Sequence, residues 1–182
     1  MTMNIDGLQE YNNLLSKVRE AQDVLSVTLK EFLNAEFIKL KNKYNFIDQI
    51  SWEQWTPSFA DGDVPEFSVH ELKYKINYEF LENEVGIDPD LVDSDEENLS
   101  FDQDLEWLKR YYSGEVLEAY SKLNDYYNNN KEYIDSFNKD FKKLSTLLME
   151  LDSDLLKYIF GDPVKIVVTI DGLIEEECEP SY

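Results

Sequence analysis

The sequence predicts an α+β protein in which a long antiparallel, coiled-coil-like helical hairpin carries a small antiparallel β-sheet at its base. Apolar residues recur at spacings of three and four in two long stretches, which indicates the helices. Between these stretches, and again after the second, the period changes to two, which indicates strands. The 182 residues, 42% of them hydrophobic, suit a single domain covering residues 1–182.

The first long helix is expected over residues 5–45. Its apolar stripe is interrupted near Gln22 and Glu36. The stripe consists of Leu8, Tyr11, Leu15, Val18, Leu25, Leu29, Phe32, Phe37, Leu40 and Tyr44.

A β-hairpin is expected over residues 46–78. Ile50 and Trp52 alternate with polar neighbours, as do Leu72 and Tyr74 farther on, and the connection TPSFADGDVPE has the composition of a turn. Because Phe67 and Val69 are out of phase with Leu72, a β-bulge near His70 is also expected.

A helical region is expected over residues 107–160, with a long second helix from residue 115. Apolar residues alternate spacings of four and three from Val116 to Leu155, and Asn130, the one polar member of this seam, is expected to fix its register or pairing. An uninterrupted helix of this length measures roughly 65–70 Å, so it needs a partner of similar length. The first helix is the preferred partner, in an antiparallel pair. The alternative is dimerisation through the second helix alone. Tyr112, Tyr126 and Tyr133 are expected to be exposed and are candidates for dimer contacts.

The C-terminal strands are expected over residues 163–178. The run VKIVVTID after Pro163 is rich in β-branched residues and suits a central strand. Asp171-Gly172 then turns the chain into LIEEECE, a candidate for a charged edge strand.

Charge is concentrated in residues 79–106, an acidic insert expected to contain loop and a short helix. This segment carries twelve acids and no base, and so supplies more than half of the net charge of −22. Most charge runs are solvated loops. Here, however, apolar residues such as Phe80, Ile87 and Phe101 are interspersed among the acids. They predict that the segment is anchored on the body.

The acidic composition limits the partners. A pI near 4.2 disfavours direct binding to nucleic acid or to an anionic membrane, since both repel an anion. The expected partner is a basic protein surface, such as that of a nucleic-acid-binding protein, and a homodimer is left open. The N-terminus has no signal-peptide pattern and no apolar run approaches the length of a membrane span, so a cytoplasmic location is expected.

No catalytic, cofactor or metal motif is found in the sequence. The only histidine is His70 and the only cysteine is Cys178, which makes a zinc or copper site implausible. A calcium loop starting at Asp93 fails because Asn98 and Asp104 stand where an EF-hand needs Gly and Glu. His70 is interpreted as a structural residue of the sheet, and no enzymatic activity is expected.

Two segments resemble phage and bacterial proteins for which no activity is established. They are SWEQWTPSFADGDVPEFSV (Ser51–Val69) and FGDPVKIVVTIDGLIEEE (Phe160–Glu177), together about a fifth of the chain. The resemblance implies a shared fold core in which the two segments are neighbouring sheet elements, and it implies no catalytic residues. This chain departs from the pattern at Cys178-Glu179-Pro180, where those proteins have an aromatic residue and a histidine.

These observations predict a non-enzymatic acidic interaction protein. The favoured interpretation is a phage-related inhibitor whose carboxylates imitate DNA phosphates in the basic channel of a host or defence protein. The alternative is an acidic structural or adaptor protein whose working surface is the helical hairpin. The candidate partner-binding residues are Glu82, Glu84, Asp88, Asp90, Asp93, Asp95, Glu96, Glu97, Asp102, Asp104, Glu175, Glu176 and Glu177.

Overall fold

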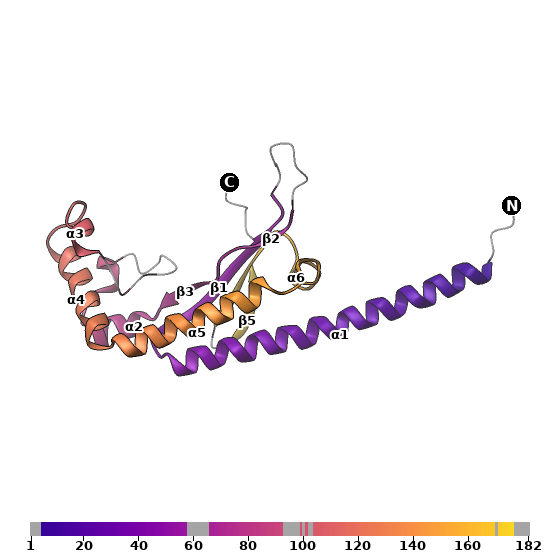
Figure 1. Cartoon of the computed structure of the whole chain (residues 1–182), viewed down its shortest axis with the longest axis horizontal. Helices are drawn as coiled ribbons and strands as arrows, with labels where there is room; N and C mark the ends of the chain where they lie inside the picture. The colour runs from indigo at the N-terminus through magenta and orange to yellow at the C-terminus, as the bar shows by residue number, and fades with distance from the viewer. Residues whose placement is uncertain are drawn as a thin grey trace.

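A long helix projects from a mixed body of helices and a small sheet (Figure 1). The computed structural model describes residues 5–57, 66–92, 99, 101, 104–169 and 171–176, with backbone alone for residues 5–7. The helices are α1 (Ile5–Lys43), α2 (Tyr78–Phe80), α3 (Leu105–Leu108), α4 (Glu115–Asn129), α5 (Lys131–Met149) and α6 (Ser153–Phe160). The strands are β1 (Ile47–Trp55), β2 (Ser68–Val69), β3 (Lys73–Ile76), β4 (Val164–Thr169) and β5 (Gly172–Glu176). The prediction of a mixed fold with a long first helix and a small antiparallel sheet is therefore confirmed.

All strand pairs in the sheet are antiparallel, in the order β2-β1-β4-β5, and β3 also pairs with β1. β2 places Val69 opposite Gln54, whereas β3 places Lys73 opposite Ser51. The β2–β3 side thus has one more residue than β1 over this stretch, which is the bulge expected near His70. β4 is a mostly buried inner strand and β5 lies at the edge, as the C-terminal sequence predicted.

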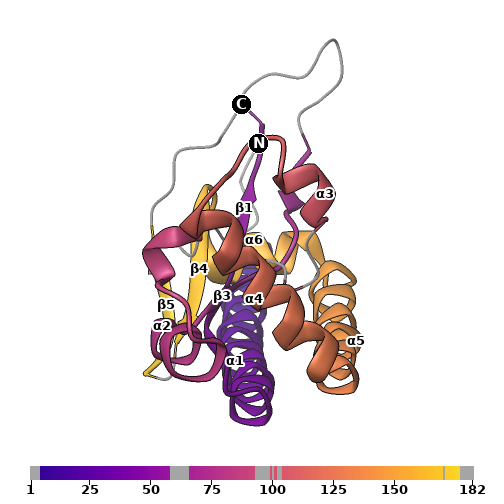
Figure 2. The same ribbon diagram turned by 90° about the vertical axis from the view of Figure 1, so that its left-hand side faces the viewer.

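The core forms where the C-terminal turns of α1 and the helix α5 lie side by side against the sheet (Figure 2). Phe37 of α1 packs on Trp52 of β1, with their ring centroids 5.5 Å apart, and both side chains are fully buried. Lys43 of α1 forms an ion pair of 2.6 Å with Asp140 of α5. The hydroxyl of Tyr44 donates to the same carboxylate at 2.8 Å. These contacts fix α5 beside the last turns of α1.

The fully buried Gln54 of β1 joins the sheet to α6 through its side-chain amide. Its amide nitrogen donates to the carbonyls of Leu156 and Gly161 at 3.2 and 2.8 Å, and its oxygen accepts from the Trp52 indole at 3.3 Å. Because a buried amide without partners is costly, these three bonds explain why the sheet tolerates a glutamine here. They also fix the C-terminal end of α6.

The prediction of one uninterrupted second helix is wrong. The chain breaks at Asn130, whose backbone leaves helical geometry (φ −122°, ψ 27°) between α4 and α5. The Asn130 side chain donates to the Tyr126 carbonyl at 3.0 Å, so it caps the end of α4 and does not fix the register of a long coiled coil. A second break precedes α6, where the Asp152 carboxylate accepts from the Leu155 amide at 2.8 Å.

The stripe predicted along α1 is buried only in its C-terminal part. Leu33, Phe37, Leu40 and Tyr44 are buried in the core, whereas eight large apolar residues from Leu8 to Phe32 are exposed. Those eight are Leu8, Tyr11, Leu14, Val18, Val24, Leu25, Val27 and Phe32. Only the C-terminal part of α1 therefore lies beside α5. The three tyrosines expected to be exposed are instead half-buried against the core: Tyr112, Tyr126 and Tyr133.

Candidate acidic interaction surface

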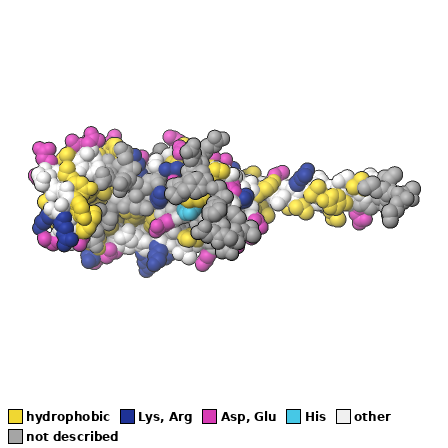
Figure 3. Space-filling model, turned by 90° about the horizontal axis from the view of Figure 1, so that it is seen from above, with side chains coloured by type: hydrophobic (Ala, Val, Ile, Leu, Met, Phe, Trp, Pro, Cys, Tyr) yellow, Lys and Arg dark blue, Asp and Glu magenta, His cyan; other side chains and the backbone are white. Residues whose placement is uncertain are grey.

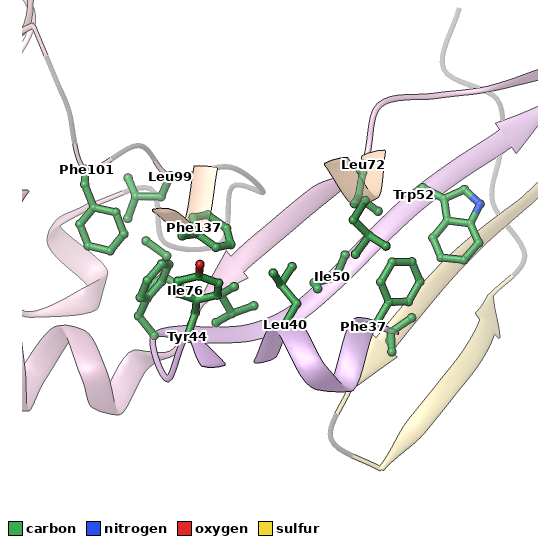
Figure 4. Packing of buried hydrophobic residues seen from close by; sticks show 14 of the residues in the cluster. Phe37, Leu40, Tyr44, Ile50, Trp52, Leu72, Ile76, Leu99, Phe101 and Phe137 are labelled. Atoms are coloured by element: carbon green, nitrogen blue, oxygen red, sulfur yellow. The ribbon is translucent and has the colours of Figure 1, made fainter. Parts of the chain in front are cut away.

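The described part of the acidic segment is attached to the body by its apolar residues, as the sequence predicted. Phe80, Leu81, Ile87 and Val92 are buried, and Figure 4 shows Leu99 and Phe101 packed near Phe137, Ile76 and Tyr44. Trp107, the residue directly after the segment, is 49% exposed. The described part of the segment therefore contributes to the core, and its charged side chains extend from a backbone that is anchored there.

Local backbone chemistry explains the turns of this segment. The Asn77 side chain accepts from the Phe80 amide at 3.1 Å and begins α2. A π-helical turn follows over Leu81–Val85 and ends at Gly86, which is in the left-handed region (φ 75°). Glycine suits this position because a side chain disfavours that conformation. The Ile87 amide then bonds to the Leu81 carbonyl at 3.1 Å and closes the turn.

Two of the predicted partner-binding carboxylates are helix caps. Asp88 accepts from the Asp90 amide at 3.0 Å and begins the 3-10 turn Pro89–Leu91. Asp104 accepts from the amides of Glu106 and Trp107 at 3.0 and 3.1 Å and begins α3. Both side chains are exposed, so they present charge to solvent while they stabilise the backbone.

The other predicted residues divide into exposed carboxylates and positions outside the described residues. Glu82, Glu84 and Asp90 are exposed around α2 and the following turns, and Glu176 is exposed on β5. Glu175 is also on β5, where it forms an ion pair of 2.5 Å with Lys30 of α1. The remaining candidates lie outside the described residues: Asp93, Asp95, Glu96, Glu97, Asp102 and Glu177. β5 lies beside α1, away from α3 and α4, so its acids do not extend the surface around α2 (Figure 1).

A groove beside the acidic segment adds carboxylates that the sequence analysis missed. Its volume is about 230 Å³, and its lining includes Asp88 from the segment and Glu115 and Glu118 from α4. Lys122 lies among them, with its ammonium 3.2 Å from Glu118 and 3.3 Å from the Gly86 carbonyl. The missed signal was the pair of acids spaced by three directly after Gly114, since acids favour the first turn of a helix.

Positive charge is concentrated on α5 and the adjoining end of α1. Residues 39–43 and 131–143 contain seven of the seventeen basic residues. A groove of about 410 Å³ between the two helices includes Lys39, Lys43, Lys143 and Asp140 in its lining. Hydrogen bonds from Lys43, Tyr44 and Lys143 hold the pKa of Asp140 well below its usual range. In Figure 3 the carboxylates of the visible face are scattered with basic side chains among them, so that face does not carry one uniform acidic patch.

His70 packs in the sheet. Its ring stacks on Trp55 with centroids 3.4 Å apart, and one ring nitrogen is 3.3 Å from the Ser68 hydroxyl. Burial lowers the pKa of His70 below its ordinary value of 6.5. This arrangement suits a neutral, structural imidazole. Among the described residues, no group of three or more His, Cys, Asp or Glu side chains is placed to hold a metal ion.

Comparison with known proteins adds no family to this description. No family model, curated protein or solved structure matches the chain. Within the described part of the chain, none of the helices combines the length and the hydrophobicity needed to cross a membrane.

Proposed function

We propose that this chain is a non-enzymatic acidic interaction protein that binds a basic protein surface through the anchored carboxylates around α2. One observation carries the proposal: Glu82, Glu84, Asp88 and Asp90 are exposed on a backbone whose neighbouring residues are buried. Carboxylates held in this way keep their spacing when a partner approaches, so little ordering entropy is lost on binding.

The finer proposal is DNA mimicry by an inhibitor of a host or defence protein. A basic channel that binds phosphates also accepts carboxylates at fixed positions. The likeness of two segments to phage proteins suggests a phage setting. The net charge of −22 supports long-range attraction to such a channel. In this arrangement α5, with its basic residues, would be on the side of the molecule that faces away from the channel.

The test uses two charge-matched double variants. Glu82→Gln with Glu84→Gln removes two exposed acids from the proposed surface, whereas Glu10→Gln with Glu20→Gln removes two exposed acids from α1. Each immobilised protein captures partners from a cell lysate at low salt, and a salt gradient followed by duplex DNA elutes them. We expect the first variant to release its partner at lower salt than wild type, and the second to match wild type, because binding depends on the charges around α2.

Two outcomes would contradict the proposal. One is capture that is insensitive to salt and to duplex DNA. The other is equal weakening by both double variants, which would mean that net charge alone, without a particular surface, governs binding.

A structural or adaptor role is the second candidate function. The specific observation in its favour is the row of exposed apolar residues on the projecting part of α1, and not the α1–α5 contact, whose apolar residues are largely buried. An adaptor of this kind would lose its partner when the exposed Leu25 becomes Glu and would keep it when Glu82 and Glu84 become Gln.

A further inference from the structure

The projecting part of α1 carries an apolar stripe that is exposed in the single chain. Eight positions separated by three or four residues are all exposed: Tyr11, Leu14, Val18, Ala21, Leu25, Thr28, Phe32 and Ala35. At roughly 100° per residue, Leu33 and Leu40, which α1 buries in the core, lie about a quarter of a turn around the helix from the middle of this stripe. Figure 3 shows hydrophobic side chains along this projecting helix. We name these eight residues the arm stripe.

We propose that the arm stripe is covered by the arm stripe of a second copy of this chain, with the two α1 helices antiparallel and a two-fold axis beside Asp23. The proposal does not depend on the acidic surface. Four features of the chain support the dimer: the spacing of the exposed residues on α1, their side-chain sizes, the charges that flank them, and the distribution of charge over the molecule.

Side-chain sizes favour the antiparallel arrangement. A two-fold axis at the level of residue 23 places each residue opposite the residue of the second copy for which the two numbers add to 46. The large side chains of Tyr11 and Leu25 therefore each face an alanine of the second copy. The four layers are Tyr11 with Ala35, Val18 with Thr28, Leu25 with Ala21, and Phe32 with Leu14. In a parallel, in-register pair each residue meets itself, and two layers would contain only alanines. Alternating large and small side chains fills the space between helices, whereas an all-alanine layer beside bulky layers leaves gaps.

The charges that flank the arm stripe fit the same arrangement. Lys17 of one copy lies opposite Glu31 of the second copy, and the two-fold axis repeats this pair. Both side chains are exposed in the single chain. In a parallel pair, Glu31 would instead lie beside Glu36 of the second copy, and like charges there are unfavourable.

Net charge also favours this site of self-association. Residues 8–35 carry four acids and three bases, although the whole chain has a net charge of −22. In the antiparallel pair, the two Leu33 residues, the first that α1 buries fully in the core, are about 30 Å apart along the helix axis, although α6 and β5 contact α1 at Asp23 and Lys30. This distance is several times the Debye length of about 8 Å at physiological salt. A parallel pair would place the two acidic bodies side by side.

The surface available is large enough for a dimer. Tyr11, Leu14, Val18, Leu25 and Phe32 are 60, 56, 53, 51 and 42% exposed. With on the order of 200 Å² for a complete large side chain, they leave roughly 500 Å² of apolar surface on each chain. Pairing two arms would cover about 1,000 Å², which is the lower limit for a specific interface.

Sedimentation equilibrium of the full chain tests the dimer. Leu25→Glu places an unpaired carboxylate in the interface, and we expect the dimer Kd to rise at least about 100-fold, since buried unpaired charges are costly. Val27→Glu makes the same change in charge at a residue that is 58% exposed and outside the arm stripe, and it should change the Kd less than about threefold. The proposal is overturned if the wild-type chain stays monomeric up to about 100 µM, or if both variants weaken the dimer equally.

Charge exchange and a distance measurement test the orientation. Lys17→Glu and Glu31→Lys should each weaken the dimer about three- to tenfold, in line with exposed ion pairs, and the double variant should regain wild-type affinity. A spin label on Asn13→Cys, in a Cys178→Ser background, should report a separation near 30 Å, the length of twenty helical residues. A separation below about 20 Å, or a stronger dimer with Glu31→Lys, indicates a parallel pair and refutes the proposed arrangement.

Discussion

Replacing Phe137 by Ala should destabilise the whole body, because this side chain is at the centre of its aromatic core. Phe137 has no exposed surface. Its ring centroid lies 5.2 Å from that of Tyr44, 4.9 Å from Phe46, 5.0 Å from Tyr74 and 5.3 Å from Phe141. Tyr44 and Phe46 belong to the turn between α1 and β1, Tyr74 to β3 and Phe141 to α5, so the substitution removes a contact shared by three parts of the fold.

The expected loss is about 4–5 kcal/mol. Phe→Ala in a core usually costs about 3–5 kcal/mol through lost burial and the remaining cavity. The upper part of that range applies here, because aromatic pairs contribute about 0.5–1.5 kcal/mol beyond their area and four such pairs are lost. Since domains are stable by only about 5–15 kcal/mol, the variant should retain a small margin of stability or unfold.

Urea denaturation followed by tryptophan fluorescence, to which the buried Trp52 and Trp55 contribute, measures this loss. With a dependence of about 2 kcal/mol per molar urea, the midpoint should fall by roughly 2 M. Tyr111→Ala is the control, because Tyr111 is 66% exposed and should change the midpoint little. A decrease below about 0.5 M for the Phe137 variant, or equal decreases for both, would refute the described core.

Three further predictions concern single polar groups. The Lys43 hydrogen bond lowers the pKa of Asp140, so the carboxylate stabilises the fold above about pH 4 and loses this effect as the pH falls through its folded pKa. Asp140→Asn should therefore cost about 1 kcal/mol at pH 7, and urea midpoints of variant and wild type should converge below pH 4. Burial against Trp55 lowers the pKa of His70, so stability should fall as the pH drops through 6.5. An NMR titration should give a pKa below 6.5 that rises in Trp55→Ala; an unchanged value would contradict the stacking. Asp104→Ala should cost about 1 kcal/mol through loss of the α3 cap, whereas Asp104→Asn keeps the cap and should cost little; equal losses in urea denaturation would argue against capping.

The strands and the first helix follow from local pattern. Leu72 and Ile76 are buried on one face, and the bulge beside His70 explains the change of phase that the sequence contains. The break at Asn130 was missed because Tyr127 and Ile134 are both buried on either side of it, so the seam continues across two separate helices. Three consecutive asparagines at 128–130 were the neglected signal, since asparagine has low helix propensity and bonds to nearby backbone groups.

The candidate surface was predictable in part. Interspersed apolar residues such as Ile87 and Phe101 correctly indicated anchoring, because acids alone give no reason for burial. The capping roles of Asp88 and Asp104 follow from helix starts that the sequence analysis had not located. The contribution of Glu115 and Glu118 depends on a tertiary contact between α4 and the acidic segment, and no local pattern contains that contact.

The position of β5 at the end of the sheet has a consequence for solubility. An edge strand offers unpaired backbone groups to any other strand that approaches it, which is the usual route to aggregation of sheet proteins. On β5, Glu175 and Glu176 follow the apolar Leu173 and Ile174, so strand addition between two molecules would bring carboxylates into close contact. These acids thereby make this edge of the sheet, as the described residues form it, a poor template for fibril growth.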